Sequence, residues 1–167
     1  ATIRRQRQMC IRDRYGTGEN PLSATDLLRT NMTDRLIKHG FILIFLALVT
    51  GFVIPQTASP RLALSAHTIG LISGILLLAV AGIWGKLCLS ERQLRITYWG
   101  WVYSGYANWG GILFGAMTGA GRMTPLASSG ATGADLPEML VGFLLISLSL
   151  AAFIAAGLSI WGITRKA

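Results

Sequence analysis

Four long stretches of mainly apolar residues divide this chain, and short polar segments separate them. They cover residues 36–54, 67–88, 96–118 and 137–163. A helix rises about 1.5 Å per residue, so about 20 apolar residues cover a hydrocarbon core about 30 Å thick. The pattern therefore predicts an all-α integral membrane protein whose four spanning helices form one bundle over residues 36–163.

The segment before the first apolar stretch falls into two parts. Residues 1–14 contain the string QRQMCIRDR, which is typical of translated sequencing-adapter text at the ends of metagenomic reading frames, and they are excluded from the predicted fold. Residues 15–35 are polar, but apolar residues recur every four positions at Leu28, Met32 and Leu36. This spacing predicts a short amphipathic helix that lies on the inner membrane surface ahead of the first span.

Basic residues are unevenly distributed among the segments that flank the four stretches. Of the 15 Lys and Arg residues, seven precede the first stretch and Lys38 lies at its start. Lys86, at the end of the second stretch, is followed by Arg92 and Arg95 before the third, and two more follow the fourth. The other two connections hold only Arg61 and Arg122. This positive-inside pattern predicts an even number of spans with both termini cytoplasmic, and we expect a bacterial inner membrane.

The net charge is interpreted through the same pattern. The formal charge of +8 falls to about +4 without residues 1–14, because five Arg and one Asp are lost with them. Eight basic residues then remain on the inner side and two on the outer side. The charge therefore indicates orientation in a membrane, and we expect no nucleic-acid partner.

Small residues recur at four-residue intervals inside the predicted helices. The longest series is Gly111, Gly115 and Gly119 in the third stretch. Small residues at this spacing let helix backbones approach closely. We therefore expect the third helix to be central and to pack against two neighbours; the alternative is that the glycines form the face of a homo-oligomer.

Aromatic residues gather near the predicted cytoplasmic ends of the helices: Trp84, Tyr98, Trp99, Trp101 and Trp161. This position predicts an interfacial belt that anchors the protein in the bilayer. Tyr106 and Trp109 differ, because they lie about 15–20 Å along the third helix, near or beyond the middle of the membrane.

Polar side chains with possible chemistry gather at the opposite, outer end of the predicted bundle: Arg61, His67, Arg122, Asp135 and Glu138, with Asn108 facing them from the third stretch. Ionisable groups at the edge of or inside a membrane are costly and are candidates for function. His39, by contrast, is predicted at the inner mouth of the first span, a full membrane thickness from His67.

Each of these polar residues also has a structural interpretation. Glu138 follows Asp135 by three residues and could complete a capping box at the start of the last helix. His67 could be a satisfied polar residue in a first helical turn, and Asn108 could join two helices. The two arginines could meet lipid headgroups.

Three strings and one glutamate in this region resemble a known family. They are SPRLALSAH from Ser59 to His67, YANW from Tyr106 to Trp109, GAGRMTPLA from Gly119 to Ala127, and Glu138 at the start of the last stretch. In this order they resemble the hydroxylaminobenzene mutases, over about residues 36–163. The chain departs from the family pattern at Ser59, where the family has asparagine. It departs again at Thr68 and Ile69, where the family has a leucine–glutamate pair.

The resemblance implies a membrane isomerase that converts an aryl hydroxylamine into 2-aminophenol. This reaction needs a proton on the leaving oxygen, a surface that tolerates a cation, and exclusion of water that would add at the para position. The candidate proton donor is Glu138 or His67. The candidate substrate-binding groups are Asn108, Arg61 and Arg122, and Tyr106 with Trp109 would form an aromatic wall. The rearrangement is redox-neutral, so we expect no cofactor and no metal.

A non-enzymatic membrane protein is the competing interpretation, either a small-ligand binder or an accessory subunit of a membrane complex. Four-helix bundles host many functions, so the fold alone does not decide between them. For the enzyme, the expected partners are a small aromatic substrate, the lipid bilayer and a second copy of the chain packed through small-residue faces.

Overall fold

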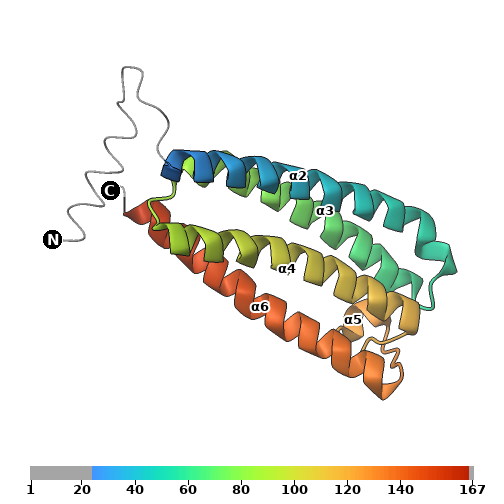
Figure 1. Ribbon diagram of the computed structural model, residues 1–167. Helices are drawn as coiled ribbons and strands as arrows, with labels where there is room; N and C mark the ends of the chain where they lie inside the picture. The colour runs from blue at the N-terminus through green and yellow to red at the C-terminus, as the bar shows by residue number, and fades with distance from the viewer. Residues whose placement is uncertain (1–23, 166–167) are drawn as a thin grey trace.

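The structure is a computed structural model that describes residues 24–165, and within this range it is all-helical (Figure 1). Its long helices are α2 (Ala24–Val53), α3 (Pro60–Ile83), α4 (Glu91–Thr118) and α6 (Asp135–Thr164). The connections contain two 3-10 turns, η1 (Ile54–Gln56) and η2 (Trp84–Lys86), and the one-turn helix α5 (Pro125–Ser128). The predicted adapter segment, residues 1–14, lies outside the described residues.

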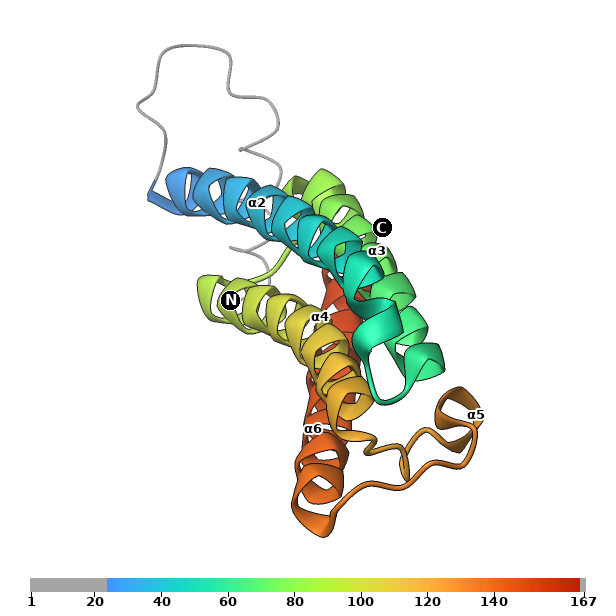
Figure 2. The ribbon, with the colours of Figure 1, turned by 90° about the vertical axis from the view of Figure 1, so that its right-hand side faces the viewer.

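The long helices pack as two hairpins, α2 with α3 and α4 with α6 (Figure 2). Helix α4 packs along both α3 and α6 and also touches α2, which confirms the prediction that the third helix is central. Helices α3 and α6 hardly contact each other. The start of α2 and the end of α6 lie at one end of the molecule, the terminal end, and η1 and α5 lie at the other, the α5 end (Figure 1).

Three helices are long and apolar enough to cross a membrane: Asp26–Gln56, Pro60–Lys86 and Asp135–Thr164. Their outward faces carry large apolar side chains, among them Phe45, Phe143 and Phe153, which are 65, 68 and 78% exposed. Continuous apolar faces of this extent are expected to contact lipid and not water. The predicted span 96–118, which lies in α4, does not meet the same criterion, because glycines, Asn108 and several Trp and Tyr residues lower its hydropathy.

The prediction of a separate amphipathic helix before the first span is wrong. Helix α2 runs unbroken from Ala24 to Val53, with no proline to end it earlier. Leu36 is fully buried and Met32 is 8% exposed, and both belong to a core that includes Trp84. The side chain of Arg29 donates hydrogen bonds to the carbonyl of Leu87 at 2.9 Å and to that of Leu89 at 3.4 Å. The first turns of α2 therefore cover the α3–α4 connection.

This cover also corrects the predicted aromatic belt. Trp99 and Trp161 are 61 and 40% exposed, as expected of anchors. Trp84 is fully buried and Tyr98 is 3% exposed, because the start of α2 packs over them. Trp101 turns inward and donates from its indole nitrogen to the hydroxyl of Ser159 at 3.2 Å.

The glycine series of α4 works within the chain. A Cβ at Gly115 would lie 2.7 Å from the carbonyl oxygen of Ala120, and one at Gly111 would lie 3.6 Å from Leu144 of α6. Gly119 has a φ of 73° and ends the helix in the left-handed conformation that favours glycine. Close packing inside one chain is thus confirmed for Gly115, whereas a Cβ at Gly111 would make only an ordinary contact, and the homo-oligomer stays a prediction.

Candidate functional site

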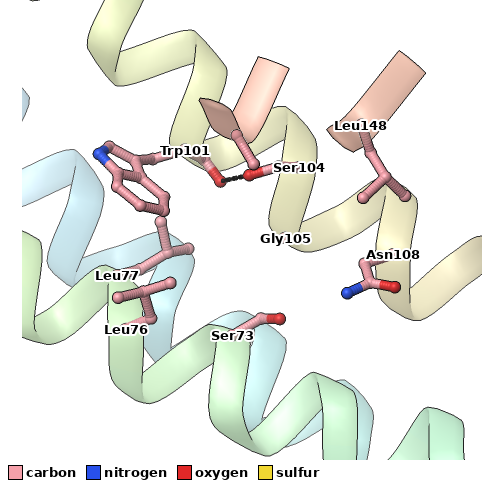
Figure 3. Close-up of a pocket in the computed structure, with 9 residues that line it drawn as sticks. Ser73, Leu76, Leu77, Trp101, Ser104, Gly105, Asn108 and Leu148 are labelled. Atoms are coloured by element: carbon pink, nitrogen blue, oxygen red, sulfur yellow. Dashed lines mark hydrogen bonds between the residues drawn. The ribbon is translucent and has the colours of Figure 1, made fainter. Parts of the chain in front are cut away.

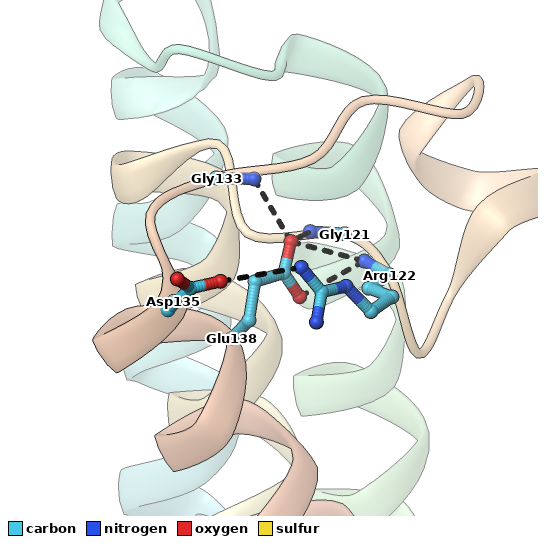
Figure 4. A network of polar contacts seen from close by, with 5 residues as sticks. All are labelled: Gly121, Arg122, Gly133, Asp135 and Glu138. Atoms are coloured by element: carbon cyan, nitrogen blue, oxygen red, sulfur yellow. Dashed lines mark hydrogen bonds and ion pairs between the residues drawn. The ribbon is translucent and has the colours of Figure 1, made fainter.

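The carboxylate of Glu138 lies at the α5 end, surrounded by backbone N–H groups (Figure 4). One oxygen accepts from Gly121 at 3.0 Å, from Gly133 at 2.8 Å and from Arg122 at 3.3 Å, and the other accepts from Arg122 at 3.0 Å. The residue is 4% exposed. Glu138 therefore ties both ends of the α4–α6 connection to the first turn of α6.

Two glycines allow the connection to close around this carboxylate. A Cβ at Gly121 would clash with the side chain of Ser128, and one at Gly133 would lie 2.9 Å from the backbone nitrogen of Ala120. Glycine is the residue that permits such close backbone approach. The sequence string GAGRMTPLA thus has a structural purpose, which is to wrap the chain around Glu138.

The predicted capping box is not formed. The N-cap of α6 is Ala134, and it has no side-chain cap. Asp135 instead approaches the guanidinium of Arg122 at 3.5 Å, where the two side chains are 98 and 61% exposed. An exposed pair of this kind contributes little to stability. Glu138 does accept a hydrogen bond from the N–H of Gly133, just before the helix. This bond is one of several from the α4–α6 connection to the same carboxylate.

Both predicted arginines lie at the α5 end with Glu138. Arg61, at the start of α3, donates from its guanidinium to the hydroxyl of Ser129 at 2.8 Å. Arg122 contributes its backbone N–H to Glu138 and its side chain to Asp135. The structure thus brings Arg61, Arg122 and Glu138 together, as predicted, but each contacts the α4–α6 connection.

His67 lies on α3, against α2. Its Nδ1 is 2.7 Å from the carbonyl oxygen of Ala47. A carbonyl only accepts, so we infer that Nδ1 carries hydrogen and that Nε2 holds a lone pair in the neutral ring. Gly51 makes room for this ring, since a Cβ there would lie 3.3 Å from Nδ1. Nε2 is therefore the nitrogen through which His67 can exchange a proton.

The two aromatic candidates of α4 also face α2. Trp109 donates from its indole nitrogen to the hydroxyl of Thr50 at 3.1 Å and packs over Gly70, where a Cβ would lie 2.7 Å from both the indole and Ala47. Trp109 and His67 thus contact the same segment of α2. Tyr106 lies about one turn away and has a different partner.

That partner is His39, which the sequence placed too far away. Its Nδ1 is 3.2 Å from the hydroxyl of Tyr106, and the two rings meet edge to face. His67 contacts Ala47, eight residues after His39, so the two histidines differ by about 12 Å along α2 and not by a membrane thickness. The error arose because α2 begins at Ala24, which puts His39 in the middle of the helix.

Asn108 points away from α2, into a cleft of about 130 Å³ between α3, α4 and α6 (Figure 3). The lining residues come from these three helices: Ser73, Leu76, Leu77, Trp101, Ser104, Gly105, Asn108, Leu148 and Ala152. Sequence reasoning found Asn108 but missed Ser73. In the sequence, Ser73 is a single serine beside Gly74 in a long apolar stretch, and this pattern is too weak to mark it as a site residue.

Comparison with known proteins now decides the family. Residues 32–164 match the family model described as styrene oxide isomerase. The chain belongs to the styrene oxide isomerase family. Hydroxylaminobenzene mutase HabB of Ectopseudomonas oleovorans is 40% identical over 142 residues, which cover 81% of this chain and 87% of that protein. Hydroxylaminobenzene mutase HabA of the same organism is 36% identical over 135 residues, which cover 80% of this chain and 100% of that protein.

Membership of the styrene oxide isomerase family confirms the resemblance found in the motifs and makes this chain an isomerase. The competing interpretation, a non-enzymatic membrane protein, is therefore wrong. The matched range contains every candidate site residue described above. No solved structure matches the chain.

Proposed function

We propose that this isomerase converts an aryl hydroxylamine, such as hydroxylaminobenzene, into 2-aminophenol by moving the hydroxyl group from nitrogen to the ortho carbon. The observation that carries the proposal is 36–40% identity to two hydroxylaminobenzene mutases over at least 80% of the chain. The order of SPRLALSAH, YANW and GAGRMTPLA along the sequence supports it independently of overall identity.

The proposed reaction balances within the substrate. A proton adds to the oxygen of the N–OH group, the N–O bond breaks with its electron pair on oxygen, and water leaves. The positive charge spreads over nitrogen and ring. The same water then adds to the ortho carbon and loses one proton, which replaces the proton used at the start. A second proton moves from that carbon to nitrogen, which restores the aromatic ring and the amine. The product is an isomer of the substrate.

Of the two candidate proton donors, we favour His67. Both oxygens of Glu138 already accept hydrogen bonds, and the residue is 4% exposed, so a substrate has little access to it. His67 keeps Nε2 free of the bond to Ala47. When the ring is protonated on both nitrogens, Nε2 supplies its proton to the reacting oxygen directly or through one water.

The remaining candidates take supporting roles. Tyr106 and Trp109 face α2, as His67 does, and form the aromatic wall that faces the developing cation. Asn108 points away from this wall, and we assign it no contact with the reacting group. We assign Arg61 and Arg122 to the α4–α6 connection instead of to the substrate, because their guanidinium groups already pair with Ser129 and Asp135. Glu138 holds the same connection in place.

We also propose that all four long helices span a bacterial inner membrane, with both termini cytoplasmic. The described chain starts and ends at the same end of the molecule, and the basic residues gather in the segments there (Figure 1). Helix α4 is the least apolar of the four, and the other three helices contact it. The apolar bilayer would dissolve the substrate and keep bulk water from the cation.

The test is turnover by the purified full chain in lipid vesicles. We expect hydroxylaminobenzene to yield 2-aminophenol, separated from 4-aminophenol by chromatography. His67→Gln should lower turnover on the order of 100-fold, as loss of a general acid does, while Thr68→Ala on the same helix should not. Styrene oxide is assayed in parallel because the matched family carries that name. Turnover of styrene oxide without any product from aryl hydroxylamines would contradict the proposal.

A further inference from the structure

The first part of the α4–α6 connection folds back along the helices at the α5 end, and α5 lies beside the helix ends and not beyond them (Figure 1). The side chain of Met123 lies beside the second turn of α6, where a Cβ at Gly142 would be 3.7 Å from its Cγ. Ala127 packs against a cluster that includes Ala63 and Ala66 of α3. At 1.5 Å per residue, Gly142 lies about 10 Å from the start of α6 and Ala66 about 9 Å from the start of α3. Segment 123–127 therefore lies at the depth of turns that belong to the proposed spans.

Segment 123–127 leaves its largest apolar side chains uncovered. Leu126, the second residue of α5, is 89% exposed, more than any other large apolar residue in the described chain, and Met123 is 48% exposed. On the other side of the same turn, Ala127 packs on α3, and the buried Ser128 donates to the carbonyl of Gly121 at 3.1 Å. Helix α5 is thus one amphipathic turn, with one face fixed to the protein and one face that no residue of the described chain covers.

The helices that this segment contacts also expose apolar side chains at the same depth. On α6, the exposed residues Leu136, Met139 and Phe143 are spaced by three and four positions, so one apolar face begins in the first turn. On α3, Leu64 is exposed in the second turn. Segment 123–127 is therefore continuous with surfaces that are expected to contact lipid, and Leu126 is not an isolated apolar residue on a polar surface.

The backbone of the connection is satisfied in the way that lipid surroundings require. N–H groups along it donate to carbonyls of the connection or to the carboxylate of Glu138: those of Gly121, Arg122, Thr124, Ser128, Gly130, Ala131 and Gly133. Pro125, at the start of α5, has no N–H group. A surface loop can leave such groups to water, whereas irregular backbone at membrane depth must find its partners within the protein.

Two guanidinium groups flank segment 123–127. Arg61, in the first turn of α3, donates to the hydroxyl of Ser129, and Arg122 meets Asp135 in an exposed pair. A guanidinium has five N–H donors, so each of these groups can bind a further acceptor. Arginine near a helix end extends its charged group to the membrane surface while its stem stays among apolar groups. Exposed apolar side chains beside two cations complement a phospholipid surface.

From these observations we infer that segment 123–127 is inserted in the lipid leaflet at the α5 end, with Leu126 and Met123 among acyl chains and Arg61 and Arg122 at glycerophospholipid phosphates. The inference rests on the proposed topology and not on the proposed reaction. Residues 129–133 would remain in water. Because α3 and α6 hardly contact each other, the segment, which touches both, would join their ends within the leaflet.

The first experiment measures the depth of single spin labels on the full chain in vesicles of phosphatidylethanolamine and phosphatidylglycerol. Leu126→Cys, Phe143→Cys and Ala131→Cys are labelled in turn, after Cys10→Ser and Cys88→Ser have removed the native thiols. We expect the label at Leu126→Cys to collide more often with oxygen, which concentrates in lipid, than with a water-soluble nickel chelate, as the label at Phe143→Cys does. Ala131→Cys, an exposed position of the same connection, is the matched control and should show the reverse.

The arginine contacts are tested with the same label. In Leu126→Cys, the changes Arg61→Gln and Arg122→Gln together should lower the ratio of oxygen to nickel collisions several-fold, because the segment loses its contacts with phosphate. Asp135→Asn should leave the ratio unchanged, since it keeps both cations. An unchanged ratio without the two arginines would overturn their assignment to phosphate. The label at Phe143→Cys checks that the variants remain inserted.

The second experiment uses the unmodified chain and so does not depend on the folding of any variant. Phosphatidylcholine with a photoreactive diazirine in its acyl chain is added to the same vesicles, and the labelled peptides are identified by mass spectrometry after illumination. We expect lipid adducts within 123–127 and at the exposed face that contains Phe143, and none within 129–133. Adducts confined to the long helices would overturn the insertion.

The outcomes distinguish the inference from the topology on which it rests. A label at Leu126→Cys that the nickel chelate reaches, while Phe143→Cys stays in lipid, would overturn the insertion and leave the proposed spans standing. Nickel access at Phe143→Cys as well would overturn the spans together with the inference. Spin–spin broadening at Leu126→Cys that disappears when unlabelled chain is mixed in would mean that a second copy covers the segment, and this too would overturn the inference.

Discussion

Replacement of Glu138 by glutamine tests whether this residue is a structural tie or a proton donor. The carboxylate accepts from three backbone N–H groups, those of Gly121, Gly133 and Arg122. The single oxygen of a glutamine can keep the bonds from Gly121 and Gly133. Its NH₂ group would then face the N–H of Arg122, so that two donors meet. A hydrogen bond to a charged acceptor contributes roughly 1 kcal/mol more than one to a neutral acceptor. Over three N–H groups the loss is about 3 kcal/mol, partly offset because a neutral amide is less costly to bury.

We therefore expect Glu138→Gln to lower the free energy of unfolding by about 2–3 kcal/mol, which corresponds to a fall of roughly 5–10 °C in unfolding temperature for a chain of this size. Unfolding is followed in detergent, and turnover is measured per folded molecule, where we expect a change of less than about threefold because the carboxylate does not touch the substrate. Asp135→Asn is the control, since that side chain is 98% exposed and should shift neither quantity. A Glu138→Gln protein with wild-type stability but no turnover would refute the tie and make Glu138 the proton donor.

Three further predictions address packing, topology and the N-terminal segment. Gly115→Ala should lower the unfolding temperature, because the added Cβ would lie 2.7 Å from a backbone carbonyl, whereas Gly157→Ala, with nothing within 4 Å, should leave it unchanged or raise it. Reporter proteins fused after Arg165 and inserted within 129–133 should lie on opposite sides of the membrane; the same side for both would contradict the proposed spans. A chain without residues 1–14 should insert and turn over as the full chain does, and failed insertion would show that the segment is native.

Much of the fold followed from hydropathy, because long apolar stretches leave a chain few alternatives to membrane helices. The central place of α4 followed from its small residues. What the apolar pattern did not contain was the true start of α2: residues 24–35 are polar by composition, yet Met32 and Leu36 are buried against Trp84. That contact depends on where the α3–α4 connection turns, which is tertiary information. For this reason the sequence predicts neither the burial of Tyr98 nor the position of His39 in the middle of α2.

The candidate site shows a similar division. The motifs identified polar residues that the fold does place near helix interfaces, but a motif gives no directions for its side chains. Glu138 points into the backbone of its own connection, and Asn108 and Trp109, although adjacent in sequence, face different helices. Ser73, which lines the same cleft as Asn108, could not be identified from sequence, because a single serine in an apolar stretch does not show which way it points.

The low hydropathy of α4 has a consequence for how the protein is made. On the proposed topology, α4 must enter the bilayer although glycines, aromatic rings and Asn108 make it the poorest candidate for insertion by itself. Helix α6, the most apolar of the four, follows after a connection that Glu138 fastens to it. During synthesis, α4 would therefore wait at the membrane surface until α6 emerges from the ribosome, and the two would enter as one hairpin. A nascent chain arrested before residue 135 should leave α4 accessible to a water-soluble label, and one arrested well after residue 164 should protect it.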